Sequence, residues 1–124
     1  MDIKRSIWVT FQREGIHCYP DAKNIEGVEF LQYPHRHVFH FRVEVEVFHD
    51  DRDLEFIKEK RYMEGLFNND VLSLQHKSCE MISDDLASHL YDRYSTKPRC
   101  VTIEISEDGE NGCRVSYPAI RTLP

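Results

Sequence analysis

The chain has 124 residues, of which 40% are hydrophobic and 31% are charged, and its formal net charge is -6. This length fits one domain spanning residues 1–124, with a hydrophobic core large enough to be stable without disulfide bonds. The acidic balance argues against nucleic acid or an anionic membrane as the main partner. No apolar run approaches the ~18 residues of a membrane span, and the first residues lead into an amphipathic strand rather than a signal peptide. We therefore expect a cytoplasmic protein.

Residues 6–19 alternate between polar and apolar side chains and predict a β-strand. Ile7, Val9 and Phe11 define its apolar face, and His17 has the same parity. Side chains two residues apart on a strand share a face, so His17 should point inward. Gly15 is a possible bulge, and a bulge would change the parity of His17.

Residues 38–48 predict a second, longer strand, because every other side chain is apolar, beginning with Phe39. Counting backwards, His35 and His37 fall in register with that apolar set. The preceding residues 28–33 fit a short strand or an ordered approach segment ended by Pro34. All three imidazoles, from His17, His35 and His37, are therefore expected to face one interior.

The rest of the chain predicts two helices followed by a hairpin. A short helix fits residues 54–62, and Ser78 is a good N-cap for a helix with an apolar stripe that extends to Tyr94. Residues 99–106 alternate again, and Asp108-Gly109 and Asn111-Gly112 are hairpin-turn signals before a last strand over 113–117. The expected fold class is α+β, an antiparallel sheet with two helices on one face.

Three convergent histidines predict a zinc site, because catalytic zinc uses three protein ligands and keeps one position for water or substrate. The alternative is that His35 and His37 only line a strand end and are hydrogen-bonded or solvated. The four cysteines are widely spaced, with no Cys-x-x-Cys pair, and are expected to be free thiols. Cys18 has the opposite strand parity to His17 and is not expected to bind the metal.

These residues resemble the 6-pyruvoyl-tetrahydropterin synthase family, which includes 6-carboxy-tetrahydropterin synthases. The strand ending at His17 is similar to the family's first strand, and His35-Arg36-His37 resembles its His-Gly-His ligand pair. Ser78-Cys79-Glu80 is similar to the family's Thr-Ser-Glu helix start. The resemblance covers nearly the whole chain. It implies the tunnelling fold (T-fold), zinc held by His17, His35 and His37, and a pterin or purine-like ligand at the subunit interfaces of a homohexamer.

The chain also departs from the family pattern. The family's catalytic cysteine should precede the histidine pair, but residues 30–33 are Phe-Leu-Gln-Tyr. Glu64 and Gly65 stand where the family has its Asp-His pair, so Glu64 is the remaining candidate for proton transfer. The family's pterin-anchoring glutamate aligns with Ile105, and Glu104 or Glu107 could replace it only with a register shift. Ser78, Cys79, Glu104 and Arg36 complete the candidate ligand-binding residues.

Three functions remain open from the sequence. The first is a divergent, zinc-dependent pterin synthase-like lyase with altered or reduced catalysis. The second is a non-catalytic T-fold module that binds a pterin, purine or nucleotide at subunit interfaces. The third is a ring-forming structural protein whose histidines bind no metal.

Overall fold

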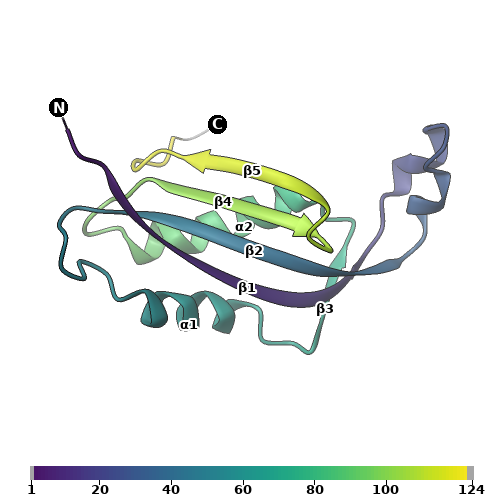
Figure 1. The fold of residues 1–124 in the computed structure, drawn as a ribbon. Helices are drawn as coiled ribbons and strands as arrows, with labels where there is room; N and C mark the ends of the chain where they lie inside the picture. Colours follow the sequence, from purple (N-terminus) through teal and green to yellow (C-terminus); the bar gives the residue numbers. More distant parts are fainter. Residues whose placement is uncertain (1, 123–124) are drawn as a thin grey trace.

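The computed structural model describes residues 2–122. It contains a five-stranded sheet with strand order β3-β1-β2-β4-β5 and two α-helices (Figure 1). The strands are β1 (Arg5–His17), β2 (His35–Val47), β3 (Val71–Gln75), β4 (Val101–Glu107) and β5 (Asn111–Tyr117), and the helices are α1 (Phe56–Leu66) and α2 (Cys79–Arg93). Within the described range, no helix is both long and apolar enough to cross a membrane.

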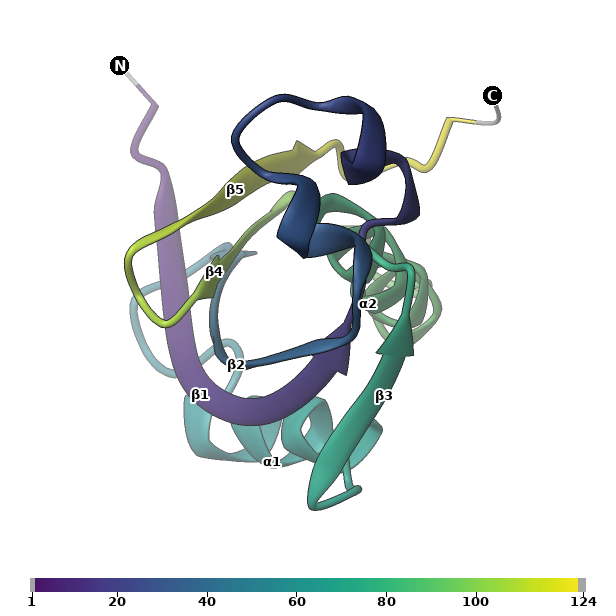
Figure 2. The ribbon, with the colours of Figure 1, turned by 90° about the vertical axis from the view of Figure 1, so that its right-hand side faces the viewer.

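The longest pairing in the sheet joins β1 and β2. They pair antiparallel without interruption from Arg5 opposite Val47 to His17 opposite His35. The pairing runs through Gly15 without a bulge, so His17 keeps the parity that the sequence predicts relative to β2. Both strands bend strongly along their length (Figure 2).

One hydrophobic core joins the sheet to both helices. The alternating apolar residues of β1, β2 and β4 face this core, with Phe39, Val43 and Ile105 at 0% exposure. Met63 of α1 and Leu86 of α2 belong to the same cluster. Both helices therefore cover the same face of the sheet, and the α+β fold class is confirmed.

The two helices are also joined by polar contacts. The buried Glu59 of α1 accepts two hydrogen bonds from Arg93 of α2, at 2.9 and 3.0 Å, and a third from the Tyr94 hydroxyl at 2.7 Å. Burial opposes ionisation of Glu59, but the bonds from Arg93 and Tyr94 outweigh it and hold the pKa of this carboxyl below its ordinary value. A buried carboxylate is stable only when it is paired in this way.

Two segments differ from the sequence-based expectation. The segment before the second strand, 28–33, forms a 3-10 helix (Glu29–Gln32) that follows another (Pro20–Asn24), and both project beyond the end of the sheet (Figure 1). Strand β3 was not expected, and it pairs parallel with the end of β1. Its five residues include only two buried apolar side chains, Leu72 and Leu74, which is too short a pattern to recognise in isolation.

Candidate metal centre

Three histidines meet at one end of the sheet. His17 is the last residue of β1, and it lies opposite His35, the first residue of β2. The His17 and His35 ring centroids are 4.6 Å apart, and the His37 ring lies 4.9 Å from His35 and 5.4 Å from His17. The structure therefore brings together all three imidazoles that the strand parity selects.

A carboxylate from a third strand joins them. Glu107, the last residue of β4, places its Oε2 atom 2.8 Å from His17 Nε2 and 3.5 Å from His37 Nε2. One potential ligand atom from each of the four residues lies within 4.8 Å of the other three. The four side chains thus form a compact set of nitrogen and oxygen donors.

Each imidazole is oriented through its Nδ1 atom. His17 Nδ1 lies 2.9 Å from the Lys77 carbonyl, and His35 Nδ1 lies 2.8 Å from the Tyr33 carbonyl. His37 Nδ1 lies 2.7 Å from Oδ2 of Asp108. Carbonyl and carboxylate oxygens only accept hydrogen bonds, so in each contact the Nδ1–H group donates. With Nδ1 as the donor, the neutral form of each ring carries its lone pair on Nε2, the atom through which such a histidine binds a metal.

The Nε2 atoms of His17 and His37 are buried and make no hydrogen bond with any residue in the described range. The Glu107 carboxylate is close to both, but it does not lie where an Nε2–H group would donate to it. Buried polar atoms without a partner are rare and costly. Histidine nitrogen and carboxylate oxygen are zinc ligands, so this donor set fits a bound zinc ion.

Asp108, which follows Glu107 in the turn after β4, supports β2 as well as His37. Its Oδ1 accepts a hydrogen bond from the Val38 backbone N–H at 2.9 Å, while Oδ2 accepts from His37. These two contacts hold the pKa of the Asp108 carboxyl below its ordinary value. Asp108 has φ 60°, a left-handed conformation that aspartate tolerates at a tight turn.

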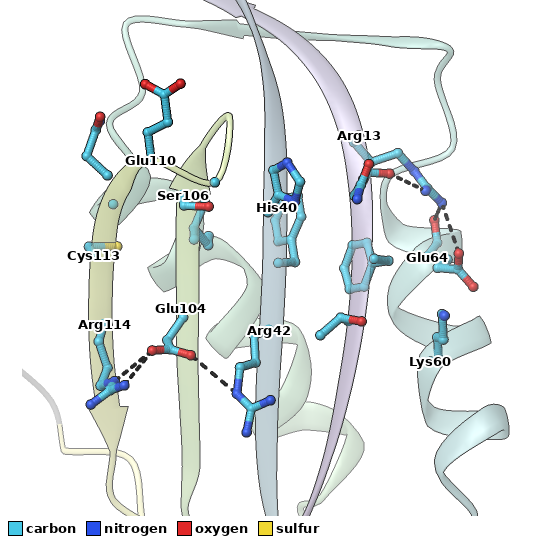
Figure 3. A pocket seen from close by; sticks show the side chains of 18 residues that line it. Arg13, His40, Arg42, Lys60, Glu64, Glu104, Ser106, Glu110, Cys113 and Arg114 are labelled. Atoms are coloured by element: carbon cyan, nitrogen blue, oxygen red, sulfur yellow. Dashed lines mark hydrogen bonds and ion pairs between the residues drawn. The ribbon is translucent and has the colours of Figure 1, made fainter.

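Three of the remaining sequence-based candidates, Glu64, Glu104 and Arg36, do not belong to this cluster. Glu64 of α1 lies 3.9 Å from Arg13, and Glu104 of β4 accepts hydrogen bonds from Arg114. Both acids line an open hollow of about 1000 Å³ on the sheet, which none of the four clustered residues lines (Figure 3). Arg36 lies 3.7 Å from Glu14 and is largely exposed.

The helix start at Ser78-Cys79 has a structural explanation. The Ser78 hydroxyl accepts a hydrogen bond from the Met81 N–H and so caps α2. Cys79 is 8% exposed, and burial, followed by the nearby Glu107, raises the pKa of its thiol to about 12. A thiol in this state is protonated at neutral pH and is a poor nucleophile.

Two acids at this site, Glu107 in the cluster and Asp108 beside it, are not identified as metal-site residues from the sequence. Glu107 enters there only as a substitute for the pterin-anchoring glutamate, and Asp108 only as part of a turn. The signal for Glu107 is its parity, which it shares with Val101, Ile103 and Ile105. A carboxylate in the core-facing register of a strand is unusual unless it is paired or binds a metal. Asp108 carries no comparable signal, because Asp-Gly is an ordinary turn sequence.

Comparison with known proteins gives a structural match without a sequence match. No protein-family model matches the chain, and no curated protein matches it. Among solved structures, the chain is similar to the 6-pyruvoyl tetrahydropterin synthase of Plasmodium falciparum, with a TM-score of 0.64 and 15% sequence identity. The match covers 94% of this chain and 99% of that one. The chain therefore has the α+β T-fold of that enzyme and resembles the 6-pyruvoyl-tetrahydropterin synthase family.

Proposed function

We propose that the protein is a zinc-binding relative of the pterin synthases that acts on a pterin or purine-derived compound with reduced catalysis. The observation that carries this proposal is the convergence of His17, His35 and His37, together with the buried Nε2 atoms of His17 and His37 that have no hydrogen-bond partner. The structural likeness to a pterin synthase supports the substrate class.

In this proposal the three histidines hold the metal, and their Nδ1 contacts fix each ring in the orientation that binding requires. Bound zinc would polarise a hydroxyl or carbonyl oxygen of the substrate. A ligand near the metal would also meet the segment between β1 and β2, whose Phe30 and Tyr33 side chains are 67% and 65% exposed. Exposed aromatic rings offer stacking surfaces to a planar heterocycle.

Reduced catalysis follows from the groups available for proton transfer. General acid–base groups contribute about 10²–10⁴-fold each. The stretch 30–33 offers no cysteine, and the Cys79 thiol stays protonated. Glu64, the proton-transfer candidate from the sequence, has Arg13 as its charged neighbour. A retained metal with weakened proton transfer predicts slow turnover.

Two measurements test the proposal. Metal analysis of the purified protein should find one zinc per chain, and incubation with dihydroneopterin triphosphate should give a zinc-dependent product at a low rate. The matched variants are His35→Ala, which removes a ligand, and His40→Ala, which changes a histidine of the same strand that lines the open hollow. Turnover that His35→Ala leaves unchanged, or a wild-type protein free of zinc, would contradict the proposal.

The second candidate is a T-fold module that binds a pterin, purine or nucleotide without chemistry. The missing proton-transfer groups favour it, because residues 30–33 contain no cysteine, Gly65 stands where the family has a histidine, and the buried Cys79 thiol stays protonated. Calorimetric titration with these ligands, combined with an absence of turnover, would support it. If the protein contains no zinc and binds none of these ligands, the ring-forming structural role is the function that remains.

The homohexamer is also a proposal by resemblance, with ligand sites at the subunit interfaces. Sedimentation equilibrium measures it directly, and a monomer at micromolar concentration would contradict it. The cytoplasmic location expected from the sequence stays a prediction.

A further inference from the structure

We infer that Glu107 supplies a fourth protein ligand to the metal, so that the three histidines and this carboxylate close its coordination sphere. This inference rests on the proposed zinc site and concerns its resting state. Structural zinc sites have four protein ligands, whereas catalytic sites keep one position open. The identity of the fourth ligand therefore decides whether a substrate oxygen can reach the metal directly.

The first argument is the position of Glu107 Oε2. It lies 2.8 Å from His17 Nε2 and 3.5 Å from His37 Nε2, although both rings present lone pairs on that side. Two lone-pair atoms at 2.8 Å repel each other unless a cation lies between them. A proton on Nε2 does not satisfy this requirement, because the contact lacks hydrogen-bond geometry. A metal ion that binds both atoms satisfies it.

The second argument is that Glu107 has no lysine or arginine partner among the described residues. Its ion-pair contacts among the described residues are with His17 and His37 alone, and no lysine or arginine takes part. Its other oxygen, Oε1, accepts a weak hydrogen bond from Asn111 Nδ2 at 3.4 Å. Oε2 is thus left free toward the histidines. The side chain is only 23% exposed, so solvent compensates its charge incompletely.

Glu104, three residues earlier on the same strand, shows the contrast. It faces the open hollow, pairs with Arg114 at 2.6 Å and lies 3.4 Å from Arg42. Its charge is already balanced. Glu104 therefore provides a matched control for Glu107: the same residue type on the same strand, with its charge directed away from the histidines.

A closed coordination sphere adds to the expected loss of activity. A substrate oxygen could bind the metal only after the Glu107 carboxylate moves away. Slow turnover would then have two separate causes, namely the missing proton-transfer groups and an occupied metal position. Replacing Glu107 should restore an open position even though it restores no proton-transfer group.

Cobalt substitution tests this directly, because the visible spectrum of Co²⁺ reports its ligands without requiring turnover. The wild-type Co²⁺ protein should show a four-coordinate spectrum that added azide does not change. Glu107→Gln should show a shifted spectrum that responds to azide, and Zn²⁺ affinity lower by at least ~10-fold, since even outer-shell partners contribute that much. Glu104→Gln should match the wild type in its Co²⁺ spectrum, in its lack of response to azide and in its Zn²⁺ affinity.

The outcomes separate this inference from the proposed function. If wild-type protein binds Co²⁺ and azide perturbs it as strongly as Glu107→Gln, the fourth-ligand inference is wrong and the three-histidine site stands. If wild-type protein binds neither metal ion, both proposals fail. If Glu107→Gln binds no metal while circular dichroism shows an unchanged fold, the carboxylate is a required ligand and the inference is supported.

Discussion

His17 and His35 lie directly opposite each other at the end of the β1–β2 pair, with ring centroids 4.6 Å apart. The seventeen residues between them form the projecting segment with its two 3-10 helices. A metal bound by both rings would therefore close the base of this segment. Metal binding at this point would couple the order of the segment to the presence of the metal.

Zinc removal should destabilise the protein through this link. A ligand that binds only the folded state adds about 2.7 kcal/mol of stability at a free concentration 100 times its Kd. Thermal unfolding with and without a chelator should show this loss for wild-type protein. His35→Ala should unfold at the same temperature with and without the chelator, while His40→Ala should respond like wild type. A chelator effect that persists in His35→Ala would contradict the assigned ligand set.

Asp108 should tune the affinity of the site for zinc. Its carboxylate accepts the Nδ1–H of His37 at 2.7 Å, and outer-shell partners of this kind are typically worth about 10–100-fold in metal affinity. We expect Asp108→Asn to weaken Zn²⁺ binding within that range, measured by competition with a chromophoric chelator. Glu110→Gln, which changes another acid of the same turn, should have no such effect. If Asp108→Asn and Glu110→Gln have the same Zn²⁺ affinity, Asp108 stabilises the turn but does not affect metal binding.

The histidine site could be predicted because strand periodicity determines which side chains share a face. His17, His35 and His37 each have the parity of the apolar residues on their own strand, and the β1–β2 register then aligns the two strand ends. That alignment depends on Gly15 introducing no bulge into this pairing, which the sequence alone could not decide.

Other parts of the site depend on contacts between distant segments. The Lys77 and Tyr33 carbonyls that orient His17 and His35 are backbone groups, so no residue type marks them. The match of Glu64 to the aspartate of the family's Asp-His pair comes from counting residues along the sequence without allowing gaps. Strand β3 and its connections occupy the interval between α1 and α2, so the counted position falls inside α1 and beside Arg13.

Gly15 should be required for packing beside the histidine cluster. A Cβ atom at this position would lie 2.7 Å from Leu74 Cδ1 and 3.0 Å from the Phe39 ring. Overpacking of a core typically costs about 1–3 kcal/mol, so Gly15→Ala should lower the free energy of unfolding by that amount and weaken Zn²⁺ binding.

Gly65 of α1 provides the control for Gly15. A Cβ atom added there would have no atom within 4 Å apart from its own helix backbone and chain neighbours, so Gly65→Ala should raise stability by up to ~1 kcal/mol. Denaturant unfolding measures both changes, and a neutral Gly15→Ala would contradict the packing argument.

Cys79 should be the slowest of the four cysteines to react with thiol reagents. The pKa of its thiol is raised to about 12, mainly by burial, so almost none of it is thiolate under mildly alkaline labelling conditions. Cys100 is exposed and should be labelled first. Timed alkylation followed by peptide mass spectrometry gives the order. Rapid labelling of Cys79 in folded protein would contradict the buried, protonated state of its thiol.

Asp53 should account for part of the acid sensitivity of the fold. Its Oδ2 accepts hydrogen bonds from Arg99 at 2.9 Å and from the Phe48 N–H at 2.8 Å, and the Asp53 and Arg99 side chains are 7% and 5% exposed. The Arg99 hydrogen bond, followed by the Phe48 contact, holds the pKa of the Asp53 carboxyl far below its ordinary value. A group with a depressed folded-state pKa stabilises the fold above its unfolded value of about 3.9, and this stability is lost as the pH falls further.

Asp53→Asn should therefore be less stable than wild type at neutral pH and should lose less stability between about pH 5 and pH 2. Asp51→Asn, at a side chain that is 77% exposed, should follow the wild-type curve. Urea unfolding across this pH range measures the three proteins under the same conditions. If wild type and Asp53→Asn lose the same amount of stability between these pH values, the Asp53 carboxylate does not contribute to the acid sensitivity of the fold.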